Sequence, residues 1–136
     1  MKDSDRRLLT DLRGALLPLH KTLLDWERAA YERVHGRMAA GELLKVIVAD
    51  PQFAWLHPVS ELIVRIDETL ETEAPDTTVD LDAIVAQARR LVAPDEMGPP
   101  YAQRYRAALQ EVPDIVLAHR GVAAVLKAVP SRETLH

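Results

Sequence analysis

Residues 50–70 read DPQFAWLHPVSELIVRIDETL, and this stretch decides the fold. Its apolar residues recur at spacings of three and four, which is the period of one face of an α-helix. The residues on that face are Trp55, Val59, Leu62, Ile63, Ile66 and Leu70. Polar residues such as Glu61, Arg65 and Glu68 fall on the opposite face. We therefore expect a central core helix, with the indole of Trp55 buried, on which the other helices pack.

Two prolines interrupt this stretch and leave two interpretations open. Asp50 followed by Pro51 is a typical helix N-cap and first helical residue. Pro58 lacks the amide hydrogen that a helix interior uses, so the chain forms either two short pieces or one helix bent between Ala54 and Pro58. We favour the bent helix, because Trp55 stays in phase with the apolar residues beyond Pro58.

A heptad pattern runs along the first 35 residues, where apolar residues alternate at spacings of three and four. They are Leu9, Leu12, Leu16, Leu19, Leu23, Trp26 and Ala30. The pattern predicts a helix of about 30 residues, or about 45 Å, capped by Ser4, kinked at Pro18 and ended by Gly36. This helix could wrap its own core. Alternatively, a seam of five residues could pair with a second subunit: Leu12, Leu16, Leu19, Leu23 and Trp26.

The rest of the chain also favours helices. Residues Glu42–Ala49 are short and apolar, and we expect a helix there because a strand would have no second strand to pair with. Helical periodicity returns in a segment capped by Thr77 or Thr78, in Tyr101–Glu111 and from Pro113 onward. The sequence therefore predicts an all-α fold, a bundle of four principal helices with one or two short extra helices. We expect one domain over residues 1–130 and a disordered tail over residues 131–136.

Composition narrows the classes of function. The chain has 136 residues, of which 48% are apolar, and no Cys, which excludes disulfides, thiolate metal sites and cysteine nucleophiles. Its charged start lacks the apolar core of a signal peptide, and no apolar run reaches the length of a membrane span. We expect a cytoplasmic protein that does not enter membranes. The net charge of −4 argues against nucleic-acid binding.

Histidine and carboxylate residues are the candidates for a metal or ligand site. Glu32 and His35 have the Glu-x-x-His spacing of di-iron bundles, but a second such pair is absent from the sequence. A mixed site would need ligands from several helices. The candidate ligands are Glu32, His35, His57 and His119, to which His20, Glu27 and Asp67 could be added.

Structural roles account for the same residues. His35 suits a helix C-terminus, where a cation is favoured, and His57 could bind a carbonyl near Pro58. His119 lies on an apolar helix face, where we expect a core histidine with a hydrogen-bond partner. Asp67 lies at the edge of an apolar face, where we expect an ion pair with an Arg of a neighbouring helix.

Residues 53–68, FAWLHPVSELIVRIDE, carry a resemblance to a known group of proteins. They are similar to a stretch of small all-helical bacterial proteins of unassigned function, in which Trp-Leu-x-Pro is followed by Ser-Glu-Leu-Ile. The resemblance implies a bacterial origin. It implies no activity and brings no catalytic or binding residue to this chain.

These observations favour a non-catalytic helical interaction module, acting by self-association as a homodimer or by docking a protein partner, without a cofactor. The alternative is a helical bundle that binds a metal or small ligand through His and Glu side chains. An enzyme without a metal has only Asp67 and His57 as candidate groups, and the sequence offers them no partner.

Overall fold

The computed structural model describes residues 2–72 and 81–129, which form six α-helices and one 3-10 helix without any strand. The all-α prediction is confirmed. The predicted caps Thr77 and Thr78 and the tail 131–136 lie outside the described residues. The elements are α1 (Asp3–His35), α2 (Ala40–Ala49), η1 (Pro51–Leu56), α3 (His57–Glu71), α4 (Leu81–Leu91), α5 (Pro100–Glu111) and α6 (Pro113–Lys127).

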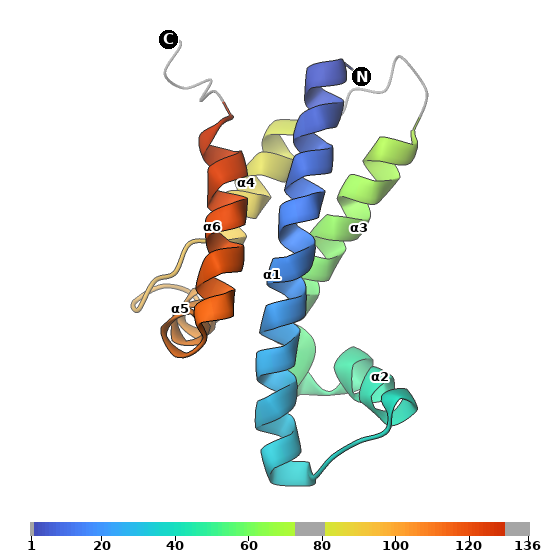
Figure 1. Ribbon diagram of the computed structural model, residues 1–136, viewed down its shortest axis with the longest axis vertical. Helices are drawn as coiled ribbons and strands as arrows, with labels where there is room; N and C mark the ends of the chain where they lie inside the picture. The colour runs from blue at the N-terminus through green and yellow to red at the C-terminus, as the bar shows by residue number, and fades with distance from the viewer. Residues whose placement is uncertain (1, 73–80, 130–136) are drawn as a thin grey trace.

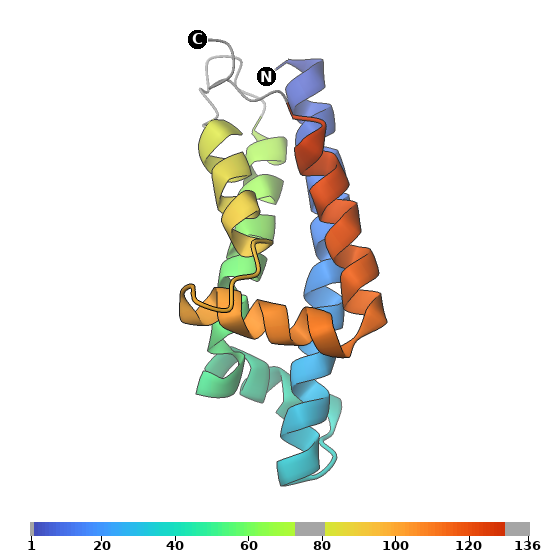
Figure 2. The same cartoon turned by 90° about the vertical axis from the view of Figure 1, so that its left-hand side faces the viewer.

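Four helices, α1, α3, α4 and α6, run side by side along the long axis of the molecule (Figure 1). Helix α5 crosses this group nearly at a right angle, at about the middle of α1 (Figure 2). Helix α2 lies beside the lower part of α1, beyond the region that α4 and α6 cover (Figure 1). The arrangement is the predicted bundle of four principal helices, and α2, η1 and the crosswise α5 are the additional elements.

Helix α1 is continuous over 33 residues and includes Pro18. The missing amide of Pro18 leaves the carbonyl of Gly14 without its helical partner, but both residues are exposed, so water can solvate that carbonyl. The kink expected at Pro18 stays a prediction. The helix ends at His35, and Gly36 follows with a φ of 83°, which confirms the predicted stop.

The predicted N-cap of α1 is wrong. Lys2 is the capping residue, and Ser4 lies within the first turn. The first turn carries Asp3 and Asp5, whose charges favour the N-terminus of a helix, so the helix begins two residues earlier than expected.

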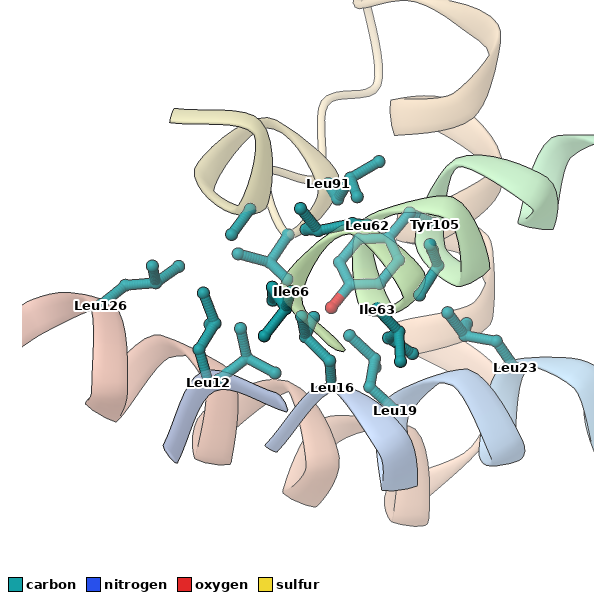
Figure 3. Packing of buried hydrophobic residues seen from close by; sticks show 14 of the residues in the cluster. Leu12, Leu16, Leu19, Leu23, Leu62, Ile63, Ile66, Leu91, Tyr105 and Leu126 are labelled. Carbon is teal, nitrogen blue, oxygen red and sulfur yellow. The ribbon is translucent and has the colours of Figure 1, made fainter. Parts of the chain in front are cut away.

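The core is built on the leucines of α1. Leu12, Leu16, Leu19 and Leu23 have no exposed surface, and Figure 3 shows them facing the apolar side chains of α3. The predicted stripe of α3 is buried too, at Val59, Leu62, Ile63 and Ile66. Leu91, Tyr105 and Leu126 close the same cluster from α4, α5 and α6.

The bent helix expected across Pro58 is wrong. The chain forms a 3-10 helix, η1, and then a separate α-helix that begins at His57. Pro58 lies in the first turn of α3, where its missing amide removes no helical hydrogen bond. The Asp50 carboxylate accepts a hydrogen bond from the backbone N–H of Gln52 at 2.9 Å and so caps η1.

The change to three residues per turn also changes which side chains of this segment are buried. Phe53 and Leu56, three residues apart, are 0% and 2% exposed. Trp55 lies out of that phase and is half-buried, so the burial predicted for its indole is only partial. It packs at the margin of the core with other aromatic residues.

We expect Leu16→Ala to lower the free energy of unfolding by about 2–5 kcal/mol, because the fully buried side chain would leave a cavity. Leu17→Ala is the matched control, since that neighbouring side chain is 39% exposed, and it should cost less than about 1 kcal/mol. Urea denaturation followed by circular dichroism measures both. Equal losses would contradict the assignment of the seam to the core.

Candidate functional site

The aromatic residues of the chain gather where α1, η1 and α5 meet. The sequence has two Trp, three Tyr and one Phe, widely separated along the chain. They are Trp26 and Tyr31 on α1, Phe53 and Trp55 on η1, and Tyr101 and Tyr105 on α5. Ring centroids lie 6.2 Å apart for Trp26 and Trp55, and 5.5 Å apart for Trp55 and Tyr101. Tyr101 stacks on Tyr105 at 5.9 Å.

An ion pair between a buried carboxylate and a partly exposed guanidinium lies inside this aromatic cluster. Glu27 is 1% exposed and is the one buried charged side chain among the described residues. One guanidinium nitrogen of Arg104, Nη2, donates to both carboxylate oxygens of Glu27 at 2.7 and 2.8 Å. The guanidinium carbon lies 4.7 Å from the ring centroid of Trp26 and 5.9 Å from that of Trp55. The cation is thus held by a carboxylate and two ring faces at once.

Two further hydrogen bonds attach α5 to its neighbours. The indole Nε1–H of Trp26 donates to Glu111 at 2.6 Å. The hydroxyl of Tyr101 donates to the carbonyl of Leu91, at the end of α4, at 2.9 Å. The crosswise helix is therefore held to α1 and α4 by long polar side chains.

Tyr105 and His119 connect α5 to α6. The hydroxyl of Tyr105 lies 2.7 Å from Nδ1 of His119. Burial, with a smaller contribution from the charge of Tyr101, raises the pKa of Tyr105 far above its ordinary value, so this hydroxyl keeps its proton. Burial also lowers the pKa of His119 below 6.5. Tyr105 and His119 are thus hydrogen-bonded to each other, with the direction set by the imidazole tautomer, which confirms the hydrogen-bonded histidine expected at this position.

The structure gives each candidate metal ligand a separate partner. Glu32 accepts a hydrogen bond from Arg28 at 2.6 Å, and His35 stacks on Tyr31. His57 Nε2 lies 3.2 Å from the carbonyl of Ile47. Within residues 2–72 and 81–129, no three His, Cys, Asp or Glu side chains come together in a way that could hold a metal ion. The sequence candidates Glu32, His35, His57 and His119 are thus not brought together.

The other sequence candidates have structural partners as well. Asp67 forms an ion pair with Arg13 of α1, which confirms the salt bridge to a neighbouring helix. His20 is half-buried beside the seam, and burial lowers its pKa. Neither residue faces a second titratable group in an arrangement that general acid–base catalysis would use.

The predicted interaction seam is occupied by the chain itself. Its leucines, Leu12, Leu16, Leu19 and Leu23, lie wholly within the bundle, and Trp26 is half-buried under Arg104. They are not a free surface of the folded chain. The seam wraps the chain's own core, which was the other use that the heptad pattern allowed.

A free apolar surface lies instead on α2. This helix reads AGELLKVIVA, yet none of its residues is buried. Leu44 and Val48 are 63% and 66% exposed, and Val34 in the last turn of α1 is 78% exposed. The sequence analysis missed this surface. The signal for it was five large apolar residues within six positions, 43–48, which are too many for one face of a short helix to bury.

Comparison with known proteins adds no assignment. No protein-family model, curated protein or solved structure matches the chain. None of the helices described here is long and apolar enough to cross a bilayer.

The ion pair in the aromatic cluster should be worth more than an exposed one. Arg104→Ala leaves the buried Glu27 carboxylate without its cation, and we expect the free energy of unfolding to fall by about 2–3 kcal/mol. This loss is smaller than that for a fully buried pair, because Arg104 is partly exposed. Arg106→Ala is the matched control on the same helix, where the pair with Glu96 is exposed, and it should cost under about 1 kcal/mol.

Tryptophan fluorescence reports the same change, because both Trp residues lie near Arg104. We expect a shifted emission maximum for Arg104→Ala and an unchanged one for Arg106→Ala. An equal effect of the two substitutions on stability would contradict a special role for the pair.

His119 should make stability depend on pH. Burial lowers the pKa of His119 in the folded chain, whereas an unperturbed His in the unfolded chain has a pKa near 6.5. As the pH falls below about 7, the unfolded chain therefore takes up the proton before the folded chain does. The free energy of unfolding should then decrease down to the folded-state pKa, and His20 adds to the decrease with the same sign. Denaturation at several pH values should give a flatter profile for His119→Gln than for the wild type. Identical profiles would contradict this role.

Proposed function

We propose that the protein is a non-catalytic helical interaction module that self-associates through α2. The observation that supports this proposal is the exposure of α2, an apolar helix without a single buried residue. Large apolar patches on a folded chain are typical of surfaces that contact another molecule. The proposal keeps the bacterial origin and cytoplasmic location that the sequence led us to expect.

The α2 face, which we define as Ala40, Leu44 and Val48, is complementary to itself. These exposed residues are four apart and share one side of the helix. In an antiparallel pair centred on Leu44, the larger Val48 of one copy lies opposite the smaller Ala40 of the other. The same contact is made twice about a two-fold axis, as in most homodimers.

The expected affinity is modest. Full burial of a Leu or Val side chain contributes about 1.5–3 kcal/mol. Two copies of Leu44 and Val48, each roughly two-thirds exposed, would contribute roughly 4–8 kcal/mol. Association costs about 4–15 kcal/mol in lost freedom of movement. The difference leaves at most about 4 kcal/mol, which corresponds to a Kd of about 1 mM, so we expect a dimer that forms only at high protein concentration and dissociates on dilution.

Other functions receive less support from the described residues. The candidate metal ligands lie apart, and the most buried carboxylate, Glu27, is neutralised by Arg104. Tyr105 and His119 satisfy each other within the bundle. Among these groups we find no activated nucleophile and no pair with separated roles as acid and base.

Light scattering across a wide concentration range tests the proposal. The wild-type mass should rise toward that of two chains as concentration increases, and Leu44→Glu should keep the chain monomeric by placing a charge in the contact. Leu117→Glu is the matched control, because Leu117 of α6 is 64% exposed, close to the 63% of Leu44. A wild-type mass of one chain at every concentration, or an equal effect of the control, would refute self-association through α2.

A further inference from the structure

A second apolar surface lies at the other end of the molecule from α2. A groove of about 540 Å³ opens between the first turns of α1, the start of α4 and the end of α6. Its volume is within the range of about 300–1,000 Å³ that is usual for ligand sites. Figure 1 places the start of α1 and α2 at opposite ends of the long axis. The groove is therefore separate from the α2 face.

Apolar side chains from all three helices line this groove. Leu8 comes from α1, Leu81 and Val85 from α4, and Val125 from α6, with Val129 just after that helix. Val85 is 7% exposed, and the other four are half-buried. The lining is a continuation of the core that the described chain does not cover completely, so apolar side chains of a partner could extend it.

Acidic groups dominate the rim. Asp5, Asp11 and Asp82 line the groove, and Arg7 is the one basic residue among the lining residues. Asp5 and Asp11 stand three residues before and after Leu8, so they flank that side chain on the helix surface. In the described part of the chain neither Asp5 nor Asp11 makes an ion pair or a side-chain hydrogen bond. Asp5 is moreover half-buried, where a carboxylate gains most from a cation.

From this combination we infer that the groove docks a basic amphipathic segment of a partner protein. Its apolar residues enter the groove, and its Lys or Arg residues meet Asp5 and Asp11. Short amphipathic helices commonly bind apolar grooves in this way. The charge argues against other occupants: a fatty acid or a nucleic acid would bring negative charge to the aspartates, and a second copy of this groove would bring aspartate against aspartate. The inference goes beyond self-association and does not depend on it.

A pair of designed peptides tests the inference on the full-length chain. Both carry Leu at helical spacing, one with Lys at the flanking positions and the other with Glu at the same positions. Fluorescence anisotropy of labelled peptide should show binding of the Lys peptide, weakening as salt is added. The Glu peptide should bind at least tenfold more weakly. Equal binding of both peptides, or binding of neither, would overturn the inference.

Substitutions in the protein locate the site. Asp5→Asn combined with Asp11→Asn should weaken binding of the Lys peptide about five- to tenfold and reduce its salt dependence, as expected for the loss of two ion pairs at the rim, one to the half-buried Asp5 and one to the exposed Asp11. Asp114→Asn is the matched control, since Asp114 is an exposed acid in the first turn of α6 and does not line the groove. An effect of the control equal to that of the double substitution would overturn the assignment.

Two further variants separate this groove from the α2 face. Val125→Asp places a charge in the apolar lining and should remove peptide binding, with circular dichroism confirming that the variant folds. Leu44→Glu should leave peptide binding unchanged while it prevents dimer formation. Loss of peptide binding in Leu44→Glu would assign the binding to α2 and overturn the inference.

Discussion

The burial of the α1 leucines between the apolar faces of α3 and α6 is the interaction on which the other elements depend. At about 1.5 Å per residue, the 33 residues of α1 span about 50 Å, whereas the 15 residues of α3 span about 22 Å. One short helix cannot cover the whole seam. Helix α6 lies alongside the same part of α1 as α3 does, and η1 packs further along α1 (Figure 1). The last turns of α1, with α2 beside them, extend beyond this shared core. The exposed face of α2 thus follows from the excess length of the first helix.

Long arginine side chains then fix how the shorter helices lie against this core. Arg13 of α1 pairs with Asp67 of α3. Arg89 of α4 donates to the carbonyl of Leu126 at the end of α6 at 3.2 Å. Arg104 of α5 reaches Glu27 across the aromatic cluster. Aliphatic packing tolerates sliding and rotation, but hydrogen bonds between specified atoms do not, so these contacts select one arrangement among several that would bury similar area.

The periodicity of apolar residues predicted the structural features that depend only on neighbours close in sequence. The leucine seam of α1 and the stripe from Val59 to Ile66 were both identified, because a core face repeats every three or four residues. Pro58 misled the prediction: phase alone favoured one bent helix, whereas a 3-10 turn followed by a new helix satisfies the proline without a bend. That turn buries Phe53 completely and leaves Trp55 half-buried at the margin of the core.

The candidate sites depend on contacts that no local pattern encodes. Trp26, Trp55 and Tyr101 come from three elements, and nothing in their spacing shows that they meet around Arg104. The heptad pattern identified an apolar seam but could not tell whether it faces its own chain or another. The same ambiguity hid α2, whose apolar composition is typical of a core helix, and the groove, whose lining is assembled from three distant segments.

The positions of the two surfaces constrain any assembly in which both are used. A dimer formed through α2 joins the chains at the ends farthest from the grooves, since the groove lies at the start of α1 (Figure 1). Self-association would then leave both grooves open and hold them far apart. Two partner segments carried on one molecule would bind such a dimer more tightly than a single chain, provided that their linker spans the separation. The monomer–dimer equilibrium of α2 would in that way control the affinity of a groove that it does not touch.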